Sequence, residues 1–375
     1  MSGIYIHIPF CKKACHYCNF HFSTSLASVD NMIDSIDKEI RMRAPTSYKN
    51  INTIYFGGGT PSILGPEKIK GLLSTIQLLF NVDPLAEITL EANPDDINTE
   101  NALAWKAMGI NRFSIGVQSF SSQNLEWMNR AHTVKQSIEC IEIIRSVGLT
   151  NFSIDLIYGT PGQDQQSWEQ DLKLALELKI PHLSCYALTV EEGTALNTMI
   201  TQGKKADVNP DEQAERFNSL VSMTKQAGYL HYEISNFAMP GMESKHNSAY
   251  WEGQPYIGFG PAAHSLQGKT RSWNISNNME YIRSIQASKL ASEQEELSAT
   301  NLLNEYIMTG LRSSKGINRE YIRHQWGEQV LGLIEIEMVQ SLQTGKLIKT
   351  DDGWKLSEEG KFFADGIASS LFIVD

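Results

Sequence analysis

Three of the five cysteines lie close together near the N-terminus, at Cys11, Cys15 and Cys18, in a C-x3-C-x2-C arrangement. A β-like run at residues 4–8 leads into them, and Pro9 ends that run and begins a loop. A loop that carries three thiolates can hold one compact metal cluster or a metal ion. The other two cysteines lie far along the chain, and we expect them to be small buried residues.

Two metal centres are compatible with this spacing. Three thiolates can hold three irons of a four-iron four-sulfur (4Fe–4S) cluster and leave the fourth iron open to an exogenous ligand. S-adenosylmethionine can bind such an iron through its amino and carboxylate groups. The alternative is a structural zinc, with His7, His16 or His21 as the fourth ligand.

Strand-like and helix-like segments alternate from residue 4 to about residue 235, which predicts an α/β fold with a parallel sheet. Six βα units indicate a partial (β/α)6 barrel rather than a closed barrel of eight strands. The expected strands are residues 4–8, 51–56, 88–91, 113–118, 152–157 and 183–188. The expected helices are residues 29–43, 66–80, 99–108, 133–147 and 165–178.

Polar residues and glycines recur where these strands end. Residues 57–59 are three glycines, Glu91 and Gln118 end the third and fourth strands, and Asp155 lies in the fifth, with Arg130 between the last two. Each could have a purely structural role, as a turn or a buried hydrogen bond. Because the carboxyl ends of parallel strands meet at one edge of a sheet, we expect them to form one polar binding site.

The rest of the chain predicts a smaller, mainly helical domain that resembles a winged helix. We expect domains at residues 1–235 and 236–375, and the latter includes an irregular, aromatic-rich connecting segment at 236–275. Further helices are expected from residue 210 to 228 and at 277–289, 297–312 and 328–344, before a hairpin over 347–356.

The cysteine spacing, the first strand and the glycine-rich second turn together resemble radical S-adenosylmethionine proteins. Four segments are similar to the oxygen-independent coproporphyrinogen III oxidase family: residues 5–11 (YIHIPFC), 55–61 (YFGGGTP), 116–120 (GVQSF) and 155–159 (DLIYG). The resemblance implies that Cys11, Cys15 and Cys18 ligate the 4Fe–4S cluster. It also implies that S-adenosylmethionine contacts Tyr5, Tyr17, Gly58, Gly59, Thr60, Glu91, Gln118, Arg130 and Asp155.

Two departures point to the haem chaperones related to that oxidase. The oxidase has a fourth cysteine two residues after the third, where this chain has Phe20, and it has a long arm before the first strand. Residues 246–251 (HNSAYW) have the H-N-x-x-Y-W pattern of the chaperones, and residues 258–265 also resemble them. The resemblance makes His246 the candidate haem ligand and His264 a weaker one, although a histidine in an aromatic loop is often structural.

The resemblance therefore implies a haem chaperone that binds haem, a 4Fe–4S cluster and S-adenosylmethionine and passes haem to an acceptor protein. Its expected partners are that acceptor and a cellular reductant, and a homodimer is expected. The alternative function is oxidative decarboxylation of coproporphyrinogen III. We assign no catalytic residue and expect no oxidase activity.

Composition limits the remaining classes of function. The formal net charge is −11 and no cluster of lysine or arginine occurs, which argues against nucleic-acid binding. No apolar run is long enough for a membrane helix, and no basic region precedes an apolar core as in a signal peptide. A cytoplasmic protein is expected, since reduced, clustered cysteines there usually bind metal.

Overall fold

A computed structural model describes residues 2–44 and 50–374, in which six parallel strands form the middle of one large sheet. These strands are β1 (Ser2–Ile8), β2 (Ile51–Gly58), β3 (Val82–Ala92), β4 (Arg112–Gln118), β5 (Phe152–Tyr158) and β6 (His182–Ala187). They correspond to the six strands expected from the sequence, and the α/β prediction is confirmed.

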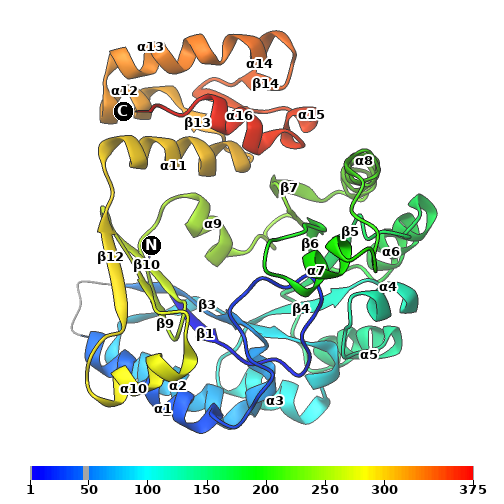
Figure 1. The fold of residues 1–375 in the computed structure, drawn as a ribbon, viewed down its shortest axis with the longest axis vertical. Helices are drawn as coiled ribbons and strands as arrows, with labels where there is room; N and C mark the ends of the chain where they lie inside the picture. Colours follow the sequence, from blue (N-terminus) through cyan, green and yellow to red (C-terminus); the bar gives the residue numbers. More distant parts are fainter. Residues whose placement is uncertain (1, 45–49, 375) are drawn as a thin grey trace.

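Amphipathic helices connect these strands and pack on the sheet (Figure 1). They are α1 (Val29–Arg43), α2 (Gly65–Leu79), α3 (Thr99–Ala107), α4 (Ser122–Trp127), α5 (Val134–Ser146) and α6 (Gln165–Glu177), with α7 (Ala195–Thr201) and α8 (Pro210–Gln226) after β6. In α1, Met32, Ile36 and Ile40 recur every fourth residue and are fully buried, so this face packs into the core. A capping box between Thr133 and Gln136 starts α5.

The sheet continues beyond the six central strands at both ends and has 12 strands in the order β12-β11-β10-β9-β1-β2-β3-β4-β5-β6-β8-β7. At one end lie β7 (Leu230–Glu233) and β8 (Asn236–Ala238), and at the other lie β9 (Tyr256–Phe259), β10 (His264–Gln267), β11 (Thr270–Asn274) and β12 (Ser292–Glu296). The expectation of an irregular segment after residue 235 is wrong, because four of these strands and α9 (Lys245–Trp251) occupy it. The proposed domain boundary at residue 235 therefore falls within the sheet.

A fully buried glutamate ties the added strands to α1. Glu39 accepts hydrogen bonds from Arg43 Nη1 (2.8 Å), Gly260 N (2.9 Å), Asn274 Nδ2 (2.8 Å) and Tyr281 OH (2.6 Å). Tyr281 lies on α10 (Asn278–Gln286), which packs against α1. Since a buried carboxylate is costly unless it is well hydrogen-bonded, these contacts hold strands β9–β11 in place.

The C-terminal part has its own hydrophobic core, formed by residues between Leu303 and Leu371. It is mainly helical, with a three-stranded sheet in the order β13-β15-β14, and it stacks above α9 in Figure 1. Its elements are α11 (Ala299–Arg312), β13 (Ile317–Asn318), α12 (Arg319–Trp326), α13 (Glu328–Glu337), α14 (Val339–Gln343), β14 (Leu347–Lys349), β15 (Gly353–Leu356), α15 (Glu358–Lys361) and α16 (Ala364–Ser370). The prediction of a mainly helical C-terminal part is confirmed.

Backbone hydrogen bonds join this part to the end of the large sheet. Ile234 N donates to Arg312 O (3.0 Å), and Ser314 N donates to Tyr232 O (2.9 Å). These bonds fix the C-terminal part beside β7, close to the carboxyl end of β6.

Within residues 2–44 and 50–374, no helix combines the length and the hydropathy that crossing a bilayer requires. The longest, α8, has 17 residues, and its buried face packs on the protein core.

Candidate functional site

The three clustered cysteines lie in the loop between β1 and α1, and backbone hydrogen bonds hold that loop in shape. Cys11 N donates to Ser23 O (3.0 Å), Ser23 N donates to Pro9 O (2.9 Å), and Cys18 N donates to Cys15 O (3.3 Å). All three cysteines are half-buried and none forms a disulfide. The loop therefore presents three reduced sulfurs that a ligand can reach.

Further hydrogen bonds fasten the loop to segments that follow β4 and β6. His16 N donates to Met128 O (3.2 Å), Leu196 N donates to His16 O (2.7 Å), and Asn129 Nδ2 donates to Ala14 O (2.9 Å). The cysteines are therefore held over the carboxyl end of the sheet, where the sequence placed the polar site.

Two polar side chains contact the cysteine sulfurs. Thr60 Oγ1 lies 3.5 Å from Cys11 Sγ, and Arg130 Nη1 lies 3.2 Å from Cys15 Sγ. Burial raises the pKa of the Cys11 thiol to about 11, against the opposing effect of the Thr60 hydrogen bond, and burial also raises the pKa of Cys18. These two thiols are therefore protonated at neutral pH in the metal-free protein and must lose their protons when metal binds.

A cavity of about 840 Å³ opens beside the cysteines at the carboxyl ends of the central strands. Eleven of the thirteen site residues expected from the sequence line it. They are Cys11, Cys15, Tyr17, Cys18, Gly58, Gly59, Thr60, Glu91, Gln118, Arg130 and Asp155.

Two carboxylates in this cavity are held largely out of water. Glu91 accepts hydrogen bonds from Tyr55 OH (2.8 Å) and Gly58 N (3.1 Å), and Asp155 accepts one from Ser114 Oγ (3.3 Å). Burial raises the pKa of Glu91 to about 7 and that of Asp155 to about 6. A positively charged ligand would stabilise the ionised form of both groups.

Arg130 links the cysteine loop to the strand ends. Besides Cys15, its guanidinium donates to Asn93 Oδ1 (2.7 Å) and Gly116 O (2.8 Å), while Nε has no hydrogen-bond partner among the described residues. Asn93 Nδ2 in turn donates to Thr60 Oγ1 (3.3 Å). The sequence alone does not single out Asn93 as a site residue, although its place directly after β3 is a signal for one.

The backbone at two strand ends adopts conformations that are rare outside glycine. Gly58 has φ of 109°, and Gln118, a non-glycine residue that lines the cavity, has φ of 68°. A Cβ atom on Gly59 would lie only 2.6 Å from Phe10 O. These features bring the backbone close to the cysteine loop and are typical of functional sites.

The zinc alternative finds no support in the positions of the nearby histidines. His7 Nδ1 and Nε2 bond to Tyr5 OH and His21 O, His16 Nδ1 to Trp127 O, and His21 Nε2 to the Asn278 side chain. Across the described ranges, no three His, Cys, Asp or Glu side chains converge as ligands of one ion. Thiolates of an iron–sulfur cluster bind different irons and need not converge in this way.

Two expected site residues lie outside this cavity. Tyr5 bonds to His7 Nδ1 through its hydroxyl (3.0 Å) and stacks on Tyr55. His246 is 3% exposed, and its Nδ1 and Nε2 bond to Thr53 Oγ1 (2.8 Å) and Tyr250 OH (3.2 Å).

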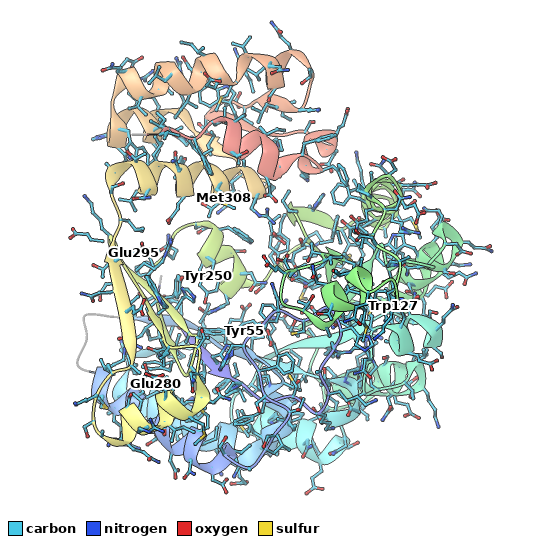
Figure 2. The ribbon with its side chains drawn as sticks, viewed as in Figure 1. Tyr55, Trp127, Tyr250, Glu280, Glu295 and Met308 are labelled. Carbon is cyan, nitrogen blue, oxygen red and sulfur yellow. The ribbon has the colours of Figure 1, made fainter. Side chains whose placement is uncertain are left out.

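The environment of His246 is built from aromatic rings. Its ring contacts Tyr55, which lies on the sheet, and Tyr250, which lies on α9; both tyrosines are labelled in Figure 2. Burial lowers the pKa of His246 to about 3, so the imidazole is neutral. Both of its nitrogens are engaged, and its role as a haem ligand stays a prediction.

Residues of the C-terminal part form most of the cavity wall that lies away from the sheet. Phe362, Phe363, Arg312 and Lys361 line it there, together with Phe217 of α8. The cavity thus has a polar floor at the strand ends and an aromatic and basic roof, which the sequence alone did not predict.

Comparisons with known proteins agree with this geometry. The model of the radical SAM superfamily, where SAM is S-adenosylmethionine, matches residues 5–175. The chain is 33% identical to "Heme chaperone HemW" of Bacillus subtilis over 98% of each chain. It is 30% identical to the protein of that name from Escherichia coli, over all of this chain and 98% of the relative.

Among solved structures, the coproporphyrinogen III oxidase of Escherichia coli, described as a radical SAM enzyme, superposes with a TM-score of 0.87. The alignment covers 99% of this chain and 90% of the oxidase at 23% identity, and it establishes the fold alone. With 33% identity to a HemW protein across nearly its whole length, the chain belongs to the heme chaperone HemW family of the radical SAM superfamily.

Proposed function

We propose that this protein is a haem chaperone that binds haem, a 4Fe–4S cluster and S-adenosylmethionine and passes haem to an acceptor protein. The observation that carries the proposal is the full-length similarity to several proteins named heme chaperones, from Bacillus, Lactococcus and Escherichia among others.

The cysteine loop supports the same function. The residue two positions after Cys18 is Phe20, and its side chain is 68% exposed in the loop. The oxidase that the sequence resembles has a cysteine at this position. An exposed phenylalanine offers no thiol there, but it does offer an apolar contact beside the cluster site.

The residues of the larger cavity fit the two cofactors. Cys11, Cys15 and Cys18 would hold the cluster and leave one iron open, and Glu91 and Asp155 would face the positive ammonium and sulfonium groups of S-adenosylmethionine. Bound to a reduced cluster, S-adenosylmethionine supplies radical chemistry.

Other residues of this cavity would orient the ligand. Arg130 is placed to balance the carboxylate of S-adenosylmethionine, and Tyr17, Thr60 and Gln118 offer further polar contacts. Tyr5 stays a prediction as a contact, since it is not among the residues that line this cavity, although it stacks on Tyr55, which does line it.

Oxidative decarboxylation of coproporphyrinogen III is the second candidate. Eleven expected cofactor contacts are retained in one cavity, and the oxidase has the same fold. Phe20 and the similarity to heme chaperones favour the first candidate.

We place this activity in the cytoplasm, because all five cysteines are free and three of them form the proposed cluster loop. The proposed partners are a haem acceptor protein and a reductant for the cluster, and we propose a homodimer as the assembly.

A paired assay on one anaerobically reconstituted sample tests the proposal. Haem titration should show tight, saturable binding, and incubation with coproporphyrinogen III, S-adenosylmethionine and dithionite should yield no protoporphyrinogen IX. Decarboxylation with no haem binding would favour the oxidase instead.

A further inference from the structure

A second cavity, of about 670 Å³, lies next to the cluster cavity. Asn19 and Phe20 of the cysteine loop line both cavities, so the loop separates them. The volume is within the range of ligand pockets, about 300–1,000 Å³. The second cavity therefore has room for an organic ligand beside the cluster loop.

This cavity contains histidines, whereas none of the residues that line the cluster cavity is a histidine. His7, His21 and His264 line it. Neutral imidazole is a common axial ligand of haem iron, so of the two cavities only this one offers that ligand among the described residues.

The three histidines differ in how many ring nitrogens are available. His7 uses both nitrogens. His21 uses Nε2, which bonds to Asn278 Oδ1 (2.7 Å), and its Nδ1 makes no hydrogen bond to a described residue. His264, on β10, has an exposed side chain whose ring nitrogens make no hydrogen bond to any described residue. Its ring lies near that of Trp273, at 6.2 Å between centroids.

His246 contrasts with His264 in each respect. It is buried, both of its nitrogens are hydrogen-bonded, and it lines neither cavity. Iron could reach it only if Thr53 or Tyr250 gave up its hydrogen bond and the packing around Tyr55 opened.

We propose that haem binds in this second cavity with His264 as an axial ligand of the iron. The proposal rests on the proposed haem-chaperone function and names the site for that function. His246 is then a positioning residue, which holds Tyr250 at the edge of the same cavity through its Nε2.

Aromatic side chains supply the apolar contacts that a porphyrin needs. Tyr5, Tyr250 and Tyr256 contribute rings to the cavity, and Tyr250 and Tyr256 pack edge to face at 4.4 Å between centroids. Phe20 adds an exposed ring from the cysteine loop. A haem in this cavity would contact Phe20 on one side, while the cluster cavity lies on the other.

The test is a haem titration of the full-length, anaerobically reconstituted protein, followed by absorption and electron paramagnetic resonance spectra. His264→Ala should weaken haem binding at least tenfold and shift the Soret band. His264→Cys should give a thiolate-type spectrum instead, which loss of packing alone could not produce. His246→Ala should keep the axial-ligand signature of the wild type, whatever its effect on affinity.

Iron–sulfur content serves as the control for folding, because His264 lies outside the cluster cavity and its variants should keep the wild-type iron content. If both His264 variants keep the wild-type spectrum and affinity, or if only His246→Ala changes the ligand signature, the assignment of His264 is wrong. If the wild type itself binds no haem, the haem-chaperone function fails, and not merely this site.

Discussion

Replacing Glu91 by glutamine separates the contribution of this residue to folding from its contribution to ligand binding. Tyr55 OH and Gly58 N donate to different oxygens of Glu91. Glutamine has nearly the same shape: its carbonyl oxygen can accept from Gly58 N, and its amide can donate to the Tyr55 hydroxyl oxygen, so both contacts can persist. The substitution therefore removes a charge and leaves the packing nearly unchanged.

The size of the stability change follows from the pKa of Glu91, which burial raises from 4.5 to about 7. Between these values the unfolded chain loses this proton and the folded chain keeps it, so stability falls as the pH rises; above about pH 7 the loss is constant. The pKa difference corresponds to about 3 kcal/mol, an upper limit because the carboxylate faces the cavity. Glutamine does not titrate and avoids this loss.

Urea unfolding of the metal-free protein at pH 5 and pH 8 measures the effect. Glu91→Gln should stabilise the protein by up to about 3 kcal/mol at pH 8 and by less than about 1 kcal/mol at pH 5. Glu142→Gln, at an exposed position of α5, is the matched control and should change little at either pH.

The same variant should bind S-adenosylmethionine more weakly once the cluster is reconstituted, because a negative charge opposite the ammonium group is lost. Equal stability of Glu91→Gln and wild type at pH 8 would refute the argument that this carboxylate is held at a cost in folding. Unchanged S-adenosylmethionine affinity would remove Glu91 from the binding site.

Three further variants test other parts of the structure. Cys18→Ala should lower the iron content well below four per chain, whereas Cys140→Ala, at a buried position outside the loop, should not. If the Cys18→Ala variant held as much iron as the wild type, Cys18 would be excluded as a ligand. Arg130→Gln should make the reduction potential of the cluster more negative, because a positive charge 3.2 Å from Cys15 Sγ stabilises the reduced cluster. A spectroelectrochemical titration measures this potential, and an unchanged value would show that the contact does not persist in the loaded protein. Asn209→Ala should lower the free energy of unfolding in urea by about 1 kcal/mol, because the Asn209 side chain accepts hydrogen bonds from Asp211 N and Glu212 N at the start of α8. An unchanged free energy of unfolding would mean that water replaces the cap.

The central strands and the cluster cavity could be predicted because their signals are local. Short β-rich runs that end in Gly-Gly-Gly or Asn-Pro mark β2 and β3, and parallel strands bring their carboxyl ends to one edge. Glu91 and Asp155 thus meet in one cavity although 64 positions separate them.

The added strands and the second cavity depend on long-range pairing, which a single sequence does not reveal. β9 lies parallel to β1, with Tyr5 opposite Gly258, and only this pairing brings β10 and His264 near the cysteine loop. Glu39 illustrates the difficulty: on a helical pattern it reads as a solvent-exposed charge, yet it is fully buried among partners more than 200 residues away.

The most direct test of the central claim is a count of both cofactors in one sample. The protein would be reconstituted anaerobically, saturated with haem, separated from free haem by gel filtration, and assayed for non-haem iron and for haem as the pyridine haemochrome. The account predicts about four non-haem irons and one haem per chain. A sample that keeps its four irons but retains no haem would contradict it.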